Sequence, residues 1–198
     1  MNSIGANQNM ASFAEIPIVK QIGFTSAELA VFEKYVRIEK FDKKKKILHL
    51  GEEESFFRLV QKGLIREYYI FNNREINTQF ATKDDIACSY TSYMDNQPSV
   101  YCIEAVEPSN VFSIKKECVD LIMSNGLKFL QFGKKIATII SKQKSIREME
   151  LLNYDTFGRL QHFKDTKPDL FLRLPQTYIA SYLNISPETF SLLKKKLK

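Results

Sequence analysis

The chain has 198 residues and a formal net charge of +6, and 44% of its residues are hydrophobic while 26% are charged. This composition is ordinary for a globular protein of one large or two small domains. No apolar run is long enough to span a bilayer, and no secretion signal opens the chain, so we expect neither a membrane span nor export. Cys88, Cys102 and Cys118 lack CxxC spacing, which indicates reduced thiols in a cytoplasmic protein.

The N-terminal segment is predicted to be a disordered leader over residues 1–20, followed by a short helix. A capping box from Thr25 to Glu28 indicates where that helix begins. Beyond Ile38 the sequence changes to short β-like segments separated by turn signals. The predicted strands are residues 47–50, 56–60, 64–70, 76–81, 100–105 and 111–114. Short strands at such regular spacing favour an antiparallel jelly roll, which we assign to residues 21–125.

A long helix is predicted over residues 126–152, because apolar residues recur there at intervals of three and four. The apolar stripe consists of Phe129, Phe132, Ile136, Ile139, Gln143 and Ile146. This spacing is typical of a dimer seam in a two-stranded coiled coil, with Gln143 as a polar position that fixes the register. The alternative is that the stripe packs on the β-domain of the same chain. A helix of this length has more face than one small domain covers, which favours self-association.

The last quarter of the chain is basic and helical. Residues 151–198 contain 8 Lys and Arg against 4 Asp and Glu, a net charge of +4. We predict a helix near residues 156–164, a break at Pro168 and then a helix that begins at Pro175, where proline is preorganised for a helix start. Asn184 and Ile185 form a turn, and Ser186 caps a second helix that runs to about Lys196.

The last helix has two distinct faces. At 100° per residue, Phe190, Leu193 and Leu197 share a stripe that would pack into a core, and polar and basic side chains lie opposite. Two short helices joined by a tight turn are typical of a helix-turn-helix whose second helix enters the DNA major groove. A solvated basic tail is the alternative. The predicted DNA contacts are Gln176, Thr177, Ser186, Glu188, Thr189, Ser191, Leu192, Lys194, Lys195 and Lys196.

The segment from Pro175 to Ser191, PQTYIASYLNISPETFS, resembles the DNA-binding motif of the Crp/Fnr regulators, roughly IAxxLGxxxETxSR. Gly51-Glu52 followed by Lys62-Gly63 is similar to the β-roll signature of that family, and the resemblance covers almost the whole chain after residue 20. It implies an α+β fold: a cyclic-nucleotide-binding-like β-roll sensor (21–125), a dimerisation helix (126–152) and a winged-helix-like helix-turn-helix (153–198) with a truncated wing. It also implies a homodimeric bacterial transcription regulator on a palindromic operator, with RNA polymerase and an unknown small-molecule effector as further partners.

The effector pocket departs from the family pattern. Members that bind cyclic AMP carry a Gly-Glu pair and a later Arg-Ser pair, and these positions fall near Cys88-Ser89 and Ser99-Val100. The ribose-binding carboxylate and the phosphate-binding guanidinium are therefore missing, and serine cannot replace the bidentate charge of arginine. We expect no physiological binding of cyclic AMP.

The second helix departs too, because Leu192 and Pro187 stand where the family has arginines. An apolar side chain at Leu192 can contact a thymine methyl, whereas arginine would bind guanine, and Glu188 can accept from a cytosine amino group. The operator is therefore expected to differ from the usual one of the family. Packing of Leu192 against a neighbouring segment is the alternative.

Sites of other kinds are not indicated. His49 and His162 stand without partners at ligand spacing, and residues 1–30 lack the cysteines of an iron–sulfur sensor, so we predict no metal and no cofactor. The acidic run from Glu52 to Glu54 is interpreted as a solvated turn, and Cys88 as a buried, inert thiol. No motif indicates an enzyme. The rival hypotheses are a sensor that acts through protein contacts, and a cupin-like enzyme, which would need a histidine cluster.

Overall fold

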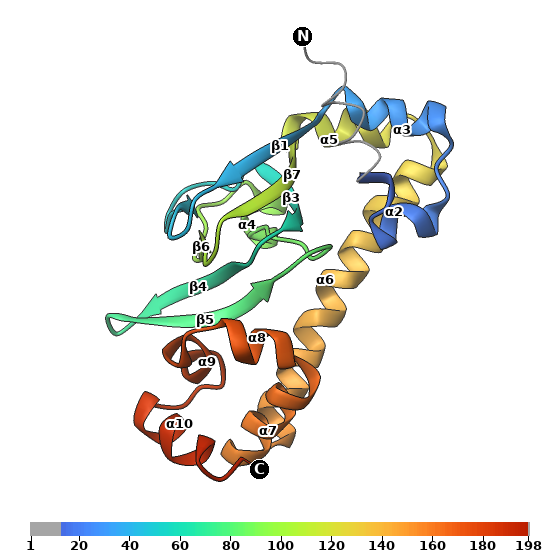
Figure 1. Cartoon of the computed structure of the whole chain (residues 1–198). Helices are drawn as coiled ribbons and strands as arrows, with labels where there is room; N and C mark the ends of the chain where they lie inside the picture. The colour runs from blue at the N-terminus through green and yellow to red at the C-terminus, as the bar shows by residue number, and fades with distance from the viewer. Residues whose placement is uncertain (1–12, 198) are drawn as a thin grey trace. The chain divides into compact units, whose positions relative to one another are not determined.

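The computed structural model describes residues 13–197, in two compact units. Of the described residues, one unit comprises 13–67 and 80–139, and the other comprises 68–79 and 140–197. Figure 1 shows the elements in chain order, from the N-terminal helices through the β-strands to the C-terminal helices. Within the described residues, no helix is both long and apolar enough to cross a membrane.

The described part of the predicted leader is helical, not disordered. Helix α2 spans Pro17–Ile22, and the side chains of Phe13, Ile16 and Val19 are buried, with exposed fractions of 0%, 2% and 2%. The Phe13 ring lies 5.1 Å from that of Phe32 and 5.3 Å from that of Phe112. The leader prediction is therefore wrong for residues 13–20, where three apolar side chains spaced three apart complete the core. Residues 1–12 lie outside the described part of the chain.

The capping box is confirmed at the start of helix α3, which spans Ser26–Glu33. The backbone N–H of Thr25 donates to Glu28 Oε2 at 2.7 Å, and the N–H of Glu28 donates to Thr25 Oγ1 at 3.3 Å. These two bonds satisfy donors that the first turn of a helix leaves unpaired.

The β-roll consists of two sheets. The strands are β1 (Val36–Phe41), β2 (Lys46–Leu48), β3 (Phe56–Lys62), β4 (Ile65–Phe71), β5 (Arg74–Ala81), β6 (Cys102–Ala105) and β7 (Ser109–Lys115). Their order is β1-β7-β3 in one sheet and β2-β6-β4-β5 in the other. The pairs β1–β7, β3–β7 and β2–β6 are antiparallel. All six predicted strands are present, while β1 was missed because three of its six side chains are charged.

Two short helices, α4 (Tyr90–Asp95) and α5 (Lys116–Met123), complete the roll. Its core is an aliphatic cluster contributed by several strands and by the segment that precedes α4. The cluster consists of Leu48, Val60, Ile65, Ala81, Ala87, Ile103 and Val111. This core fixes the segment that carries Cys88 and Ser89 against the strands.

The turn between β3 and β4 depends on Gly63, whose φ is +108°. A Cβ atom there would lie 2.2 Å from Ser109 Oγ and 2.7 Å from the carbonyl oxygen of Pro108. It would displace Ser109 Oγ, which accepts from the N–H of Leu64 at 3.2 Å and donates to the carbonyl of Glu107 at 2.7 Å. The structure therefore requires glycine here for space as well as for conformation.

We expect Gly63→Ala to lower the free energy of unfolding by about 2–5 kcal/mol, from left-handed backbone strain plus the clash. Denaturant unfolding monitored by circular dichroism measures the loss. Gly51→Ala is the matched control, because Gly51 also has a positive φ, +83°, but nothing lies within 4 Å of its Cβ position. Equal losses in the two variants would show that the close approach of Ser109 contributes nothing.

Five helices follow the roll: α6 (Leu127–Asn153), α7 (Thr156–Thr166), α8 (Pro168–Arg173), α9 (Gln176–Tyr182) and α10 (Pro187–Lys194). The predicted long helix and helix pair are thus present. Pro168 opens α8 instead of only breaking the chain, since proline lacks a donor that a first helical residue does not need. Pro175 is the N-cap of α9, so this helix begins at Gln176, one residue after the predicted start at Pro175.

Candidate functional site

The pair α9–α10 is held by an apolar core. Ile179, Ala180, Leu183 and Phe190 are buried, with exposed fractions of 1%, 0%, 2% and 0%. The turn between the helices is made by Asn184, whose φ is +55°. Asparagine tolerates this left-handed conformation better than most residues, which explains the sharp reversal. The geometry is that of a helix-turn-helix.

The second helix presents the predicted polar face. Glu188, Ser191 and Lys195 are exposed, and Leu192 is 64% exposed, so it does not pack against a neighbouring segment. Phe190 lies on the opposite side and is buried, while Leu193 and Leu197 are half-buried. The two faces of this helix are as predicted.

Two of the predicted DNA contacts also cap this helix. The N–H of Thr189 donates to Ser186 Oγ at 3.1 Å, and the two hydroxyl oxygens lie 3.0 Å apart. The pKa of Glu188 lies below its ordinary value, first because its own backbone N–H and then because the Ser186 hydroxyl donate to the carboxylate. Glu188 is therefore an ionised acceptor at neutral pH. Gln176, Thr177 and the basic residues Lys194, Lys195 and Lys196 are exposed as well.

One contact of α9 was not predicted from the sequence. Within the C-terminal unit, Ser181 Oγ donates to the carbonyl of Glu75 at 2.7 Å and accepts from the N–H of Asn77 at 3.0 Å. Asn77 Nδ2 also donates to the carbonyl of Tyr178 at 3.4 Å. Strand β5 is at the edge of its sheet, so the Ser181 hydroxyl satisfies backbone groups that an edge strand leaves open. The sequence signal that could have indicated this contact is Ser181 itself, a polar residue among the apolar residues of the helix.

The end of α6 is anchored to the helices that follow it. The Glu150 carboxylate lies 3.5 Å from Arg147 Nη1, 3.4 Å from His162 Nε2 and 3.7 Å from Lys167 Nζ. The Arg147 guanidinium lies 3.8 Å from the centre of the Tyr182 ring and also donates to the Tyr182 carbonyl. His162 therefore has structural contacts. This cluster attaches the helix-turn-helix directly to the long helix.

The residues of the predicted seam on the long helix fall into two groups, one buried within the chain and one exposed. Phe129 and Phe132 are 1% and 2% exposed, because their rings pack on those of Phe24 and Phe32 at 5.1–6.0 Å. These two residues belong to the core of their own chain, so their assignment to a dimer seam is wrong. Ile136 is also buried, at 5%.

The C-terminal half of α6 keeps an apolar face open. Gln143 is exposed, Ile139 is half-buried, and Ile146 and Met149 are 44% and 59% exposed. Leu152, three residues further, is 76% exposed. Met149 and Leu152 were not in the predicted seam, although they continue its spacing of three.

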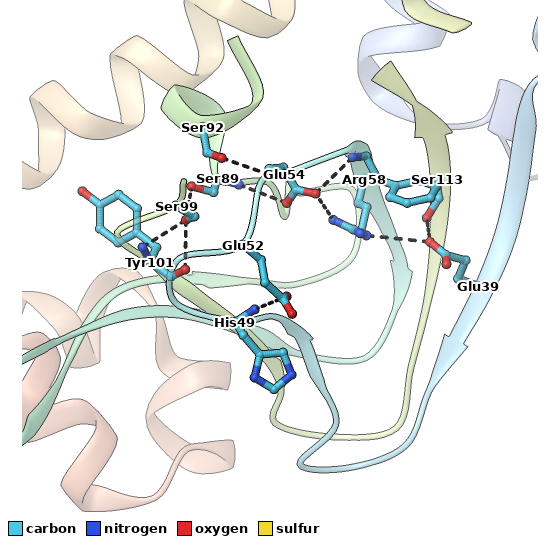
Figure 2. A network of polar contacts seen from close by, with 11 residues as sticks. Glu39, His49, Glu52, Glu54, Arg58, Ser89, Ser92, Ser99, Tyr101 and Ser113 are labelled. Atoms are coloured by element: carbon cyan, nitrogen blue, oxygen red, sulfur yellow. Dashed lines mark hydrogen bonds and ion pairs between the residues drawn. The ribbon is translucent and has the colours of Figure 1, made fainter. Parts of the chain in front are cut away.

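Two of the four predicted effector positions meet in the β-roll, at the start of α4 and in the loop before β6. Ser89 Oγ and Ser99 Oγ lie 2.7 Å apart, and both residues are buried, with exposed fractions of 1% and 2%. Figure 2 shows this pair beside the Tyr101 backbone, whose carbonyl accepts from Ser99 at 2.9 Å. Val100 is 61% exposed, so its side chain does not join the buried Ser89–Ser99 pair beside which it was predicted to lie.

Cys88 is buried next to this pair, and its thiol is free. Burial raises the pKa of Cys88 well above its ordinary value, and the Glu54 carboxylate raises it further. The thiol therefore remains protonated and unreactive at neutral pH. This agrees with the interpretation of Cys88 as an inert core residue.

A charged network lies next to Ser89 and was not predicted. Glu54 is only 3% exposed, so the acidic run that contains it is not entirely a solvated turn. Its carboxylate accepts from Arg58 Nη1 at 2.7 Å and from the N–H groups of Phe56 at 3.0 Å and Ser89 at 3.4 Å (Figure 2). Arg58 Nε lies 3.7 Å from Glu39 Oε2. Three identical glutamates in a row gave no signal of which one is buried.

No family model and no curated protein matches the chain. Among solved structures, FixK2 from Bradyrhizobium japonicum aligns with a TM-score of 0.69 at 16% identity, over 82% of this chain and 84% of its own. A CooA mutant from Carboxydothermus hydrogenoformans aligns with a TM-score of 0.70 at 18% identity, over 92% and 84%. A Eubacterium rectale protein described as a regulator of the crp/fnr family aligns with a TM-score of 0.70 at 15% identity, over 91% and 85%. At such identities the likeness shows a shared fold.

Proposed function

We propose that this chain, whose fold is of the Crp/Fnr type, is a cytoplasmic, homodimeric, sequence-specific DNA-binding regulator of transcription. The observation that carries the proposal is the exposed polar and basic face of α10, which a buried Phe190 holds in place. The family resemblance of the segment from Pro175 to Ser191 supports it independently. We assign sensing to residues 21–125, dimerisation to 126–152 and DNA binding to 153–198.

The chemistry of α10 suits the major groove. The ionised Glu188 at its first turn can accept from a cytosine amino group, and Leu192 can contact a thymine methyl. Lys194, Lys195 and Lys196 are exposed at the other end, where ammonium groups bind phosphates without sequence preference. The N-terminus of α9, with Gln176 and Thr177, would contact the backbone. Bound near a promoter, such a dimer would recruit or block RNA polymerase.

We also propose that the sensor does not bind cyclic AMP. The positions that would hold ribose and phosphate are Ser89 and Ser99, and their hydroxyl groups bond to each other. Neither position is an arginine, so neither supplies a guanidinium for the phosphate. Any effector of this protein would therefore differ in chemistry from a cyclic nucleotide.

Selection of bound duplexes from a random library tests DNA binding directly. We expect an enriched palindrome with half-sites about 34 Å apart, one turn of DNA. On the selected duplex, Lys195→Ala should weaken binding several-fold and lower the magnitude of the salt slope by about 1, because one phosphate contact is lost. Fluorescence anisotropy titrations over a range of salt concentrations measure both quantities.

Lys83→Ala is the matched control for this experiment. Lys83 is also exposed but lies in the turn after β5, outside the proposed interface. Its replacement should leave the salt slope unchanged. If no duplex is enriched, the chain is better explained as a sensor that acts through protein contacts.

A further inference from the structure

The carboxylate of Glu54 has the contacts of a bound anion, yet it belongs to the chain itself. We propose that Glu54 is a built-in ligand of the β-roll, which fills an anion site formed by Arg58 and by the N–H groups of Phe56 and Ser89. The site is thereby closed to external carboxylates and phosphates. Its role in regulation rests on the proposed function, whereas its existence as a site does not.

The donors converge on one carboxylate from separate parts of the roll. Arg58 Nη1 and the N–H of Phe56 approach Oε1 from β3, at 2.7 and 3.0 Å. The N–H of Ser89, at the N-cap position of α4, approaches Oε2 at 3.4 Å. A guanidinium together with backbone N–H groups is the donor set that proteins use for carboxylate and phosphate ligands.

The burial and the charge of this cluster disfavour the binding of a further anion. The side chain of Glu54 is 0% exposed and that of Arg58 is 5% exposed. An ionised carboxylate in such surroundings needs both the opposite charge and the hydrogen bonds to compensate for lost hydration. Glu39 faces the same guanidinium at 3.7 Å from Nε, and the Ser113 hydroxyl donates to Glu39. Two carboxylates around one guanidinium give the cluster a net charge of −1, which repels a further anion.

Glu54 also connects the segments that carry the predicted effector positions. Its backbone N–H donates to Ser92 Oγ at 3.0 Å, and that hydroxyl donates to the carbonyl of Gln97 at 2.5 Å. In the same loop as Glu54, the carbonyl of Glu52 accepts from the N–H of Ser99 at 2.8 Å. Figure 2 shows Glu54 between Ser89, Ser92 and Arg58. The loop before β3, the start of α4 and the loop before β6 are therefore joined without an effector.

The consequence for regulation is specific. In a sensor of this kind, an anionic effector would have to join the same segments that Glu54 already joins. We therefore expect the roll to hold one arrangement whether or not small anions are present. DNA binding, if the proposed function holds, should not require an anionic effector.

The experiment uses the full chain and acetate, because Glu54→Ala deletes a group with the heavy atoms of acetate. Thermal unfolding is followed in sodium chloride and in sodium acetate of equal ionic strength. We expect Glu54→Ala to lower Tm by about 10 °C in chloride, since the buried Arg58 loses its hydrogen-bonded carboxylate and keeps only Glu39, 3.7 Å from Nε. Acetate should recover at least half of that loss in a saturable way. If Glu54→Ala is already unfolded in chloride, the acetate titration measures the fraction of the protein that refolds.

Three controls separate a filled site from a general salt effect. Wild-type protein and Glu53→Ala, which removes the adjacent exposed carboxylate, should not respond to acetate beyond chloride. Glu54→Gln should be destabilised but not recovered, because the amide already fills the space. An equal acetate response in these proteins, or none in Glu54→Ala, would overturn the proposal. No DNA is present, so this result and the operator selection can fail independently.

Discussion

The double variant Ile146→Asp, Met149→Asp is expected to be monomeric and to lose at least about a hundredfold in operator affinity. Ile146 and Met149 are 44% and 59% exposed on α6, within the part of the chain that the structure describes. Two half-sites bound by one dimer gain about 10²–10⁴ in affinity over one half-site bound by a monomer. Aspartates on both copies of the helix place like charges in an apolar seam, which prevents association.

Analytical ultracentrifugation and anisotropy titrations on the selected duplex measure the two effects. Leu121→Asp is the control, because Leu121 is similarly exposed, at 52%, but lies on α5 outside the seam. It should remain dimeric and bind DNA as the wild type does. A double variant that stays dimeric would move the interface elsewhere, and a monomer with full affinity would show that dimerisation does not support DNA binding.

The long helix illustrates what periodicity can and cannot predict. Spacing of three and four indicated the helix and its apolar stripe, because both depend on local geometry. It could not indicate the partner of each stripe residue. Phe129 and Phe132 pack on Phe24 and Phe32 of the same chain, which are about one hundred residues away in sequence. Beyond Ile136 the exposure of the stripe rises, from the half-buried Ile139 to Ile146 at 44%.

The effector site shows the same limit for polar residues. Counting along the family pattern located Ser89 and Ser99, and their hydroxyl groups indeed meet at 2.7 Å. Val100 was placed with Ser99, but successive residues of an extended segment point to opposite sides. Glu54 could not be distinguished from Glu52 or Glu53, because its burial depends on Arg58 and on the N–H of Ser89. Such tertiary pairs leave no periodic signal in one sequence.

Phe190→Ala is expected to unfold the helix-turn-helix and abolish operator binding while the β-roll stays folded. Phe190 is 0% exposed, and its ring lies 6.5 Å from that of Phe171. Removing a buried phenylalanine costs about 3–5 kcal/mol, which exceeds the local stability that a few short helices can supply. Hydrogen exchange measured by mass spectrometry should show lost protection in α9 and α10 and unchanged protection in β3 and β7.

Leu192→Ala, two residues away on the same helix, separates folding from recognition. Leu192 is 64% exposed, so its truncation leaves no cavity and should keep the exchange protection of α9 and α10. If its side chain contacts a thymine methyl, the variant loses preference for thymine at one operator position while the salt slope stays the same. Phe190→Ala with full protection would mean that the buried ring does not hold α10. Leu192→Ala with unchanged base preference would remove Leu192 from the contact surface and leave base recognition to the residues around Glu188.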